Sequence, residues 1–215
     1  MDLPLPDAQS LWLFTIAALA LLLVPGPAVL YIVARSIDQG RAAGLVSILG
    51  IHSATLCHVL AAALGLSAVL ASSALAFSIV KYAGAAYLIW IGLKKIFGKT
   101  PQIDGAPAAA HGNARLFREG FIVNLLNPKT ALFFFAFLPQ FVDLSRGHVA
   151  AQMAILGLIF TALGFITDSA YSLAASSAGK WLRGNAAYLR AEKYVGGVIM
   201  VGLGLTAAFA SSGKK

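Results

Sequence analysis

The chain has 215 residues, of which 59% are hydrophobic and only 11% are charged. A soluble domain carries about a quarter charged residues, so most of this surface faces something other than water. The positive residues behind the net charge of +8 lie between apolar runs and are not gathered on an arm or groove, which argues against a nucleic-acid partner. The composition indicates an integral membrane protein.

Six apolar segments are candidates for membrane spans, since a helix needs roughly 20 mostly apolar residues to cross a bilayer. None of them alternates polar and apolar residues as barrel strands do, so the predicted fold class is all-α. A turn around Ser67–Ser73 divides the long charge-free stretch between Arg41 and Lys81. The predicted spans are Leu11–Ala34, Ala43–Leu66, Ala74–Leu93, Gly120–Val142, Val149–Leu173 and Tyr194–Phe209. No Lys or Arg precedes Arg35, so the first span is expected to be retained and not to be a cleaved signal.

An internal repeat relates the two halves of the chain. The third span begins KYAGAAYLIWIGL at Lys81 and the sixth begins KYVGGVIMVGLGL at Lys193, a shift of 112 residues. More weakly, Pro25 and its successors align with Pro128 and its successors. A unit of three spans enters from the opposite face in its second copy, so the prediction is six transmembrane helices in two inverted three-helix repeats, residues 1–98 and 114–215. Secondary transporters often have this plan, with the solute site at the midplane, although architecture alone does not establish function.

The orientation follows from the positive charges, which favour cytoplasmic loops. The stretch 99–113, rich in Pro, Gly and Ala, is predicted to be a cytoplasmic linker. The charges in the three links predicted to be cytoplasmic are Arg35, Arg41, Lys94, Lys95, Lys99, Arg115, Arg118, Lys180, Arg183, Arg190 and Lys193. The opposite side holds only Arg146, Lys214 and Lys215. Both termini are therefore expected outside the cytoplasm.

Two spans carry helix-breaking sequences at corresponding places. The first contains Pro-Gly-Pro at residues 25–27 and the fourth contains Asn-Leu-Leu-Asn-Pro-Lys at residues 124–129. Irregular backbone at membrane depth is tolerated where protein or a wet cavity satisfies the freed groups. If both breaks face one cavity, amides would hold a carboxylate and carbonyls an ammonium; the alternative is two kinks shaped by packing alone. The candidate substrate-binding residues are Pro25, Gly26, Pro27, Asn124, Asn127, Pro128, Lys129 and, in the fifth span, Asp168.

Asp168 is the one acid deep in a predicted span. A carboxylate facing lipid costs about 3 kcal/mol on insertion scales, so Asp168 is expected to face the bundle interior. There it would bind a solute amine, carry a proton or pair with a partner such as Lys129. His52 and His58 lie six residues apart on different helix faces and form a poor metal pair. Packing or interhelical hydrogen bonding is favoured for both histidines, with a proton relay as the alternative.

Several segments together resemble a known family. PGPAVLYIVARS, KYAGAAYLIWIGLKKI and FREGFIVNLLNPKTALFFF, in this order over nearly the whole chain, are similar to the lysine-exporter (LysE/RhtB-type) family of bacterial amino-acid efflux proteins. The resemblance implies export of homoserine, threonine, leucine, lysine or a related compound, by proton exchange, in the bacterial inner membrane. Many members of the family carry an Asp where this chain has Thr55, a departure that bears on substrate or coupling.

The alternatives are an inorganic cation or metal exporter and a non-transporting membrane scaffold. One cysteine and one deep acid are a thin supply of metal ligands. An enzyme is not expected, because the sequence has no nucleophile arrangement or phosphate-binding motif. We therefore expect no catalytic residue, cofactor or resident metal, and we expect a small amino acid, protons and the lipid bilayer as partners. The sequence leaves monomer and homodimer open.

Overall fold

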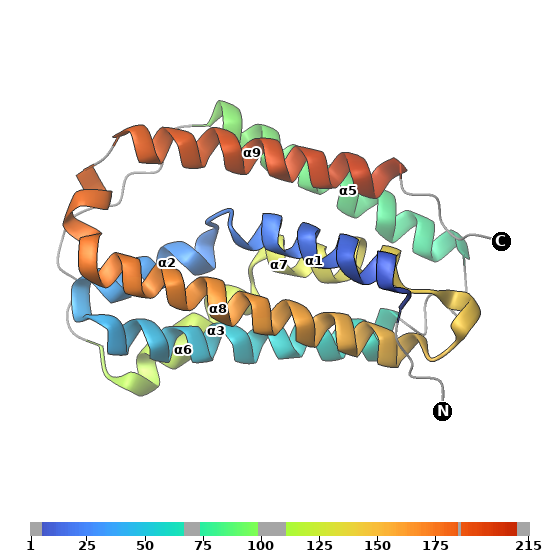
Figure 1. The fold of residues 1–215 in the computed structure, drawn as a ribbon, viewed down its shortest axis with the longest axis horizontal. Helices are drawn as coiled ribbons and strands as arrows, with labels where there is room; N and C mark the ends of the chain where they lie inside the picture. The colour runs from blue at the N-terminus through green and yellow to red at the C-terminus, as the bar shows by residue number, and fades with distance from the viewer. Residues whose placement is uncertain (1–5, 67–73, 99–110, 185, 210–215) are drawn as a thin grey trace.

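The computed structural model describes residues 6–66, 74–98, 111–184 and 186–209, and within them the regular elements are helical (Figure 1). The predicted turn at Ser67–Ser73 and nearly all of the predicted linker lie outside the described residues. The α-helices are α1 (Ala8–Leu22), α2 (Pro27–Gln39), α3 (Arg41–Ala61), α5 (Ala74–Phe97), α6 (Asn113–Leu125), α7 (Pro128–Leu132), α8 (Val149–Gly184) and α9 (Ala186–Phe209). Short π-helical and 3-10 segments extend them: η1 (Ala62–Leu66), η2 (Phe133–Phe137), η3 (Leu138–Phe141) and η4 (Leu144–Arg146).

Length and composition identify up to four membrane spans among the described helices. Arg41–Gly65 and Val149–Ser177 qualify alone. Two bent pairs qualify together: Ala8–Leu22 with Pro27–Gln39, bent by 52°, and Asn113–Leu125 with Pro128–Phe141, bent by 48°. The all-helical class is confirmed, and both predicted helix breaks are present. Helices α5 and α9 cover the segments predicted as the third and sixth spans, so six spans stay a prediction for the whole chain.

Several helices continue beyond the predicted apolar boundaries. Helix α6 begins at Asn113, seven residues before the predicted Gly120, and α8 runs on to Gly184 past Leu173. Helix α5 reaches Phe97, so Lys94 and Lys95 lie inside a helix and not in the loop to which the charge pattern assigned them. Polar residues at the end of a span remain helical because the backbone hydrogen bonds are satisfied there as well.

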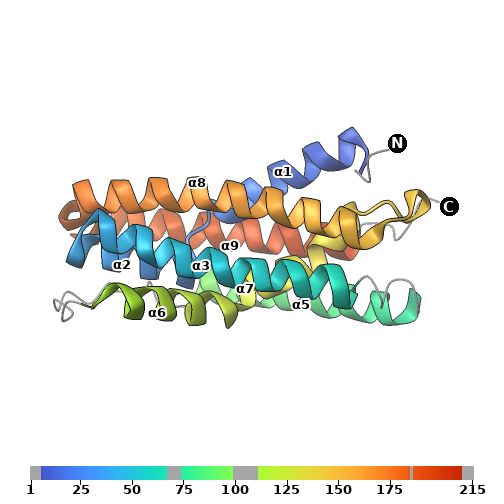
Figure 2. The same ribbon diagram turned by 90° about the horizontal axis from the view of Figure 1, so that it is seen from below.

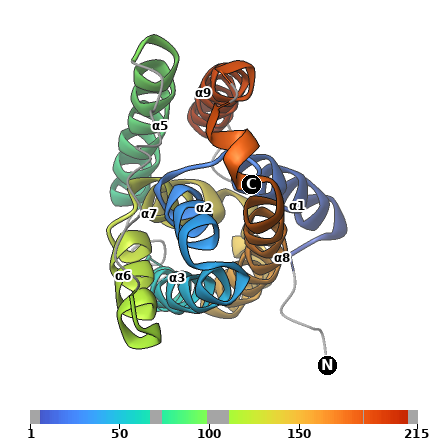
Figure 3. The same ribbon diagram turned by 90° about the vertical axis from the view of Figure 1, so that its left-hand side faces the viewer.

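The elongated bundle has two ends (Figures 1 and 2). One end holds the junction of α2 with α3, the start of α6 and the junction of α8 with α9. Helices α6 and α5 follow one another along the same side of the molecule (Figure 2). Helices α5 and α9 lie together beside the group formed by α2, α3, α6 and α8 (Figure 3).

Glycines bring two helix pairs into close contact. At the α3–α6 crossing, a Cβ on Gly50 would lie 2.1 Å from the Phe117 carbonyl oxygen, and one on Gly120 would lie 2.6 Å from the Ser47 carbonyl oxygen. At the α5–α9 crossing, a Cβ on Gly92 would lie 2.7 Å from the carbonyl oxygen of Gly197. Small residues are the usual means of close helix approach in membranes. These contacts fix α6, and with it the second break, against α3.

An aromatic cluster fills the core beside η2. Phe133 stacks on Phe160 of α8 with ring centroids 4.4 Å apart, and it also contacts Phe14 of α1 at 5.7 Å. All three rings are buried. This packing holds α1, η2 and α8 together on one side of the two breaks.

Candidate functional site: a pocket between two helix breaks

The break between α1 and α2 exposes carbonyl oxygens that side chains from three other helices satisfy. The carbonyls of residues 23, 24 and 25 accept hydrogen bonds, in that order, from the Tyr171 hydroxyl (2.8 Å), the Lys129 ammonium and the Lys95 ammonium (2.9 Å). Freed carbonyls at membrane depth need such donors. The ammonium groups of Lys129 and Lys95 therefore occupy two of the carbonyl oxygens that were predicted to bind the ammonium of a solute.

The other side of this break is the start of α2. Gly26 occupies the N-cap position and Pro27 the first helical position, and no side chain among the described residues caps the helix. Gly26 is buried against Lys129, since a Cβ there would lie 3.2 Å from the lysine Cδ. The first amides of a helix have no intrahelical partner and favour negative charge. Ala28 and Val29 carry these amides and line the pocket described below.

The second break, by contrast, is capped by its own residues. Asn127 is the N-cap of α7, and its Oδ1 accepts from the Lys129 amide at 3.1 Å. Pro27 and Pro128 take the same place, the first position of the helix that follows each break. The two breaks therefore correspond as Pro27 with Pro128, and the sequence alignment of Pro25 with Pro128 is shifted by two residues.

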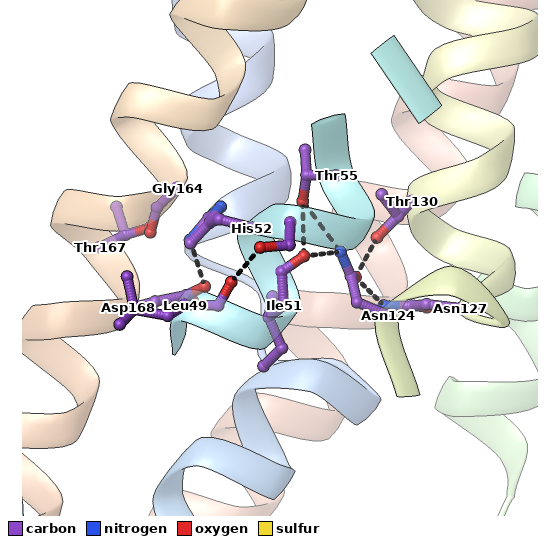
Figure 4. Close-up of polar contacts among 11 residues, drawn as sticks. Leu49, Ile51, His52, Thr55, Asn124, Asn127, Thr130, Gly164, Thr167 and Asp168 are labelled. Carbon is purple, nitrogen blue, oxygen red and sulfur yellow. Dashed lines mark hydrogen bonds and ion pairs between the residues drawn. The ribbon is translucent and has the colours of Figure 1, made fainter. Parts of the chain in front are cut away.

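Asn124 joins the second break to α3. Its Nδ2 donates to the carbonyl oxygen of Ile51 and to the Thr55 hydroxyl, each at 2.9 Å, and its Oδ1 accepts from the Thr130 hydroxyl at 2.9 Å (Figure 4). Nε2 of His58 lies 3.3 Å from the backbone carbonyl oxygen of Asn124. With both amide hydrogens used, this buried side chain positions α6 and α7 against α3.

Asp168 and His52 form a buried pair between α8 and α3. His52 Nε2 lies 3.1 Å from Asp168 Oδ2, with side chains only 9% and 6% exposed. The approach lies within ion-pair distance but outside hydrogen-bond geometry, and within the described part of the chain His52 Nδ1 has no hydrogen-bond partner. The imidazole lies over Gly164, where a Cβ would be 2.8 Å from its Cε1. The prediction that Asp168 faces the interior is confirmed.

One pocket unites these groups. Its apolar wall comes from Leu21, Leu22, Ala28, Val29, Ile51 and Phe160, and its polar wall from Gly26, His52, Thr55, Asn124, Asn127, Lys129, Thr130 and Asp168. Figure 4 shows the two sides of the polar wall, with His52 and Asp168 between α3 and α8 and with Thr55, Asn124 and Thr130 between α3 and the break that joins α6 to α7. The cavity of about 40 Å³ holds no more than about three or four waters.

The predicted site residues divide into two groups. Gly26, Asn124, Asn127, Lys129 and Asp168 line the pocket, whereas Pro25, Pro27 and Pro128 are not among its lining residues. Pro27 and Pro128 begin the helices that follow the two breaks. Lys129 bonds the first break, and the partner of Asp168 is His52. The sequence reasoning did not place His52, Thr55, Thr130 or Phe160 in the pocket, because apolar-helix patterns do not specify which faces meet. Among the described residues, no group of three His, Cys, Asp or Glu side chains is arranged to hold a metal.

Comparison with known proteins shows the family of this chain. The model of the family described as "LysE type translocator" matches residues 19–211, nearly the whole chain and both breaks. The chain belongs to the LysE-type translocator family. The family resemblance found in the sequence is thereby confirmed, and with it a membrane-embedded translocator.

This LysE-type translocator is similar to several curated proteins. It is 31% identical over 202 residues to an uncharacterized membrane protein of Vibrio cholerae, covering 94% of this chain and 98% of the other. It is 30% identical to a homoserine/homoserine lactone efflux protein of Salmonella typhimurium, over 87% of this chain and 91% of that protein. It is 27% identical to a leucine efflux protein of Enterobacter, with coverages of 73% and 75%. No solved structure matches the chain.

Proposed function

We propose that this translocator exports a small amino acid or amino-acid derivative from the cytoplasm in exchange for protons. The observation that carries the proposal is one pocket that joins a buried carboxylate, an uncapped helix start and an apolar wall. Relatives named for homoserine and leucine efflux support this class of solute.

The three features match the three parts of an amino acid. The Asp168 carboxylate takes the ammonium group, because a buried acid in a membrane requires a cationic partner. The uncapped amides at the start of α2 take the carboxylate. The side chain lies on the wall of Leu21, Val29 and Phe160. Asn124, whose amide hydrogens are both used within the protein, positions the second break.

The Asp168–His52 pair supplies the coupling to protons. A proton on the carboxylate and an ammonium beside it are alternative ways of neutralising the same buried charge. Binding of the solute amine therefore favours release of the proton, and protonation favours release of the amine. His52 lies 3.1 Å away and serves as the group that delivers or removes this proton.

A pseudo-twofold relation between the halves supports an inverted repeat. The shift of 112 residues that aligns the third and sixth spans carries Gly92 onto Gly204 and Ala85 onto Gly197. At the α5–α9 crossing, a Cβ on Gly92 would meet the carbonyl oxygen of Gly197, and one on Gly204 would meet that of Ala85, at 2.7 and 2.8 Å. The shift thus relates the two residues of one contact to the two residues of the other contact. This is expected if α5 and α9 are equivalent helices in opposite orientation. Alternating access in such folds is a movement of one repeat against the other.

The cavity of about 40 Å³ has room for only a few waters, so we infer that its walls separate to admit an amino acid. Transport requires the pocket walls to separate. The hydrogen bonds from Tyr171, Lys129 and Lys95 to the carbonyl oxygens of residues 23–25 would be rearranged by such a movement. We place the protein in a bacterial inner membrane with both termini outside the cytoplasm, as the distribution of positive charge favours.

Transport by the purified chain in proteoliposomes tests the proposal. A panel of radiolabelled amino acids that includes leucine, homoserine, threonine and lysine is offered with and without a pH gradient, and protein-free liposomes serve as the control. We expect saturable flux of one or a few members that the gradient accelerates. Absence of flux for every member, or flux of divalent cations in its place, contradicts the proposal.

A further inference from the structure

A second polar cluster lies between α2 and the start of α6, toward the end of the bundle where α2 meets α3 (Figure 1). Tyr31, Arg35 and Gln39 are spaced by four residues, so they share one face of α2. The Tyr31 hydroxyl donates to Glu119 Oε2 at 3.1 Å, and Gln39 Oε1 accepts from the His111 amide at 2.8 Å. Arg35 occupies the middle of this face, with its guanidinium carbon 5.3 Å from the centre of the Tyr31 ring.

The cluster contains hydrogen-bond donors that the described residues leave unused. Arg35 Nε and Nη1 and Gln39 Nε2 are buried, and none of them has a partner in the described part of the chain. Glu119, whose oxygens contact Arg115 at 2.7 Å, His111 at 3.2 Å and the Tyr31 hydroxyl, is not a hydrogen-bond partner of these donors. The tyrosine ring attracts the guanidinium charge but satisfies none of its N–H groups.

Buried donors of this kind require acceptor oxygens, and a charged guanidinium favours anionic ones. The carboxylate of an amino acid provides two such oxygens in one plane, the shape that guanidinium binds best. We propose that Arg35 and Gln39 form a second, carboxylate-binding subsite on α2. In an exporter this subsite receives the solute before it reaches the central pocket, a role that rests on the function proposed above.

The position on α2 suits such a role. Ala28 lines the central pocket, and Arg35 lies seven residues, or about two turns, further along the same face of α2, roughly 10 Å at 1.5 Å per residue. The two sites therefore lie one after the other between the end of the bundle and its centre. A solute held at Arg35 by its carboxylate would arrive at the uncapped start of α2 with that group already oriented.

The first test measures anion binding and does not depend on transport. The Tm of the purified chain is compared in sodium propionate and in sodium chloride at equal ionic strength, for wild type, Arg35→Gln and Gln39→Glu. Gln39→Glu keeps the acceptor for His111 but replaces the donor by a negative charge. We expect propionate to raise the Tm of wild type and of the control Arg146→Gln, an exposed arginine at the other end of the bundle, and to raise that of the two subsite variants by less. An equal rise in all four proteins overturns the proposal.

The second test measures transport in proteoliposomes with leucine and with leucinamide, which lacks the carboxylate. We expect Arg35→Gln to raise KM for leucine by at least about tenfold, the value of one charge-assisted hydrogen bond, and to change KM for leucinamide less than about twofold. Arg35→Lys should fall between. An equal change for both compounds indicates a structural role for Arg35 and overturns the relay. If wild type moves neither compound, the proposed function is contradicted, while the propionate comparison still decides the subsite.

Discussion

Removal of the Asn124 side chain tests how the second break is held in place. Asn124→Ala deletes two interhelical hydrogen bonds to α3 and leaves the buried hydroxyl of Thr130 without its acceptor. Interhelical hydrogen bonds in membrane proteins contribute on average about 0.6 kcal/mol each, up to about 1.7, and an unpaired buried group costs a further 1 kcal/mol or more. We expect a loss of about 2–4 kcal/mol.

For a chain of this size, 1 kcal/mol shifts Tm by about 2–4 °C. Thermal unfolding of Asn124→Ala in detergent should therefore occur about 4–16 °C below wild type. The matched control is Ser53→Ala on α3, the helix to which Asn124 bonds. Its exposed hydroxyl bonds only the carbonyl of Leu49 among described residues, and its loss should move Tm by less than about 2 °C. A variant at Asn124 that melts within about 2 °C of wild type would refute the assignment of this residue as the link between the break and α3.

Three further predictions follow from the helix contacts, the topology and a helix cap. Gly120→Ala places a Cβ 2.6 Å from the Ser47 carbonyl and should cost about 1–3 kcal/mol. Gly202→Ala, where a Cβ would meet no described atom within 4 Å, should leave Tm unchanged or raise it slightly; equal losses would contradict the close α3–α6 contact. With Cys57 replaced by Ser, Ser145→Cys should react with an impermeant maleimide added outside intact cells and Gly98→Cys should not; the reverse pattern rejects the proposed orientation. The Ser10 amide donates to the Asp7 carboxylate and holds its pKa below the ordinary value of 3.8, so this cap of α1 stabilises the folded state above pH 3.8 and is lost as pH falls through the lowered pKa. Asp7→Asn retains a side-chain cap without the charge, so the protection of the Ser10 amide against hydrogen exchange should no longer depend on acid pH. An unchanged pH dependence in this variant would show that another group is responsible.

The sequence predicted the features that depend on local chemistry. Pro-Gly-Pro at residues 25–27 and Asn-Pro at residues 127–128 break helices wherever they occur, because proline lacks an amide hydrogen and glycine adds backbone freedom. The cost of a carboxylate in lipid likewise required Asp168 to face inward, and it is 4% exposed.

Features that depend on which helices meet were not predictable in the same way. His52 and Asp168 lie more than one hundred residues apart in the chain, and the sequence suggested Lys129, not His52, as the partner of Asp168. Lys95 stands where a cytoplasmic loop charge was expected, yet α5 continues past it and its ammonium reaches the Pro25 carbonyl. One apolar sequence pattern is compatible with several ways of packing two helices together. Polar side chains that form hydrogen bonds between the helices then favour one of these arrangements.

The central claim is that Asp168 binds the solute amine and the proton in turn. Asp168→Asn can neither release a proton nor pair a negative charge with the solute amine. In proteoliposomes the variant should therefore exchange labelled for unlabelled amino acid only with a KM raised at least about tenfold, and it should no longer accumulate the amino acid in response to a pH gradient. Gradient-driven accumulation by Asp168→Asn at the rate of wild type would contradict the account.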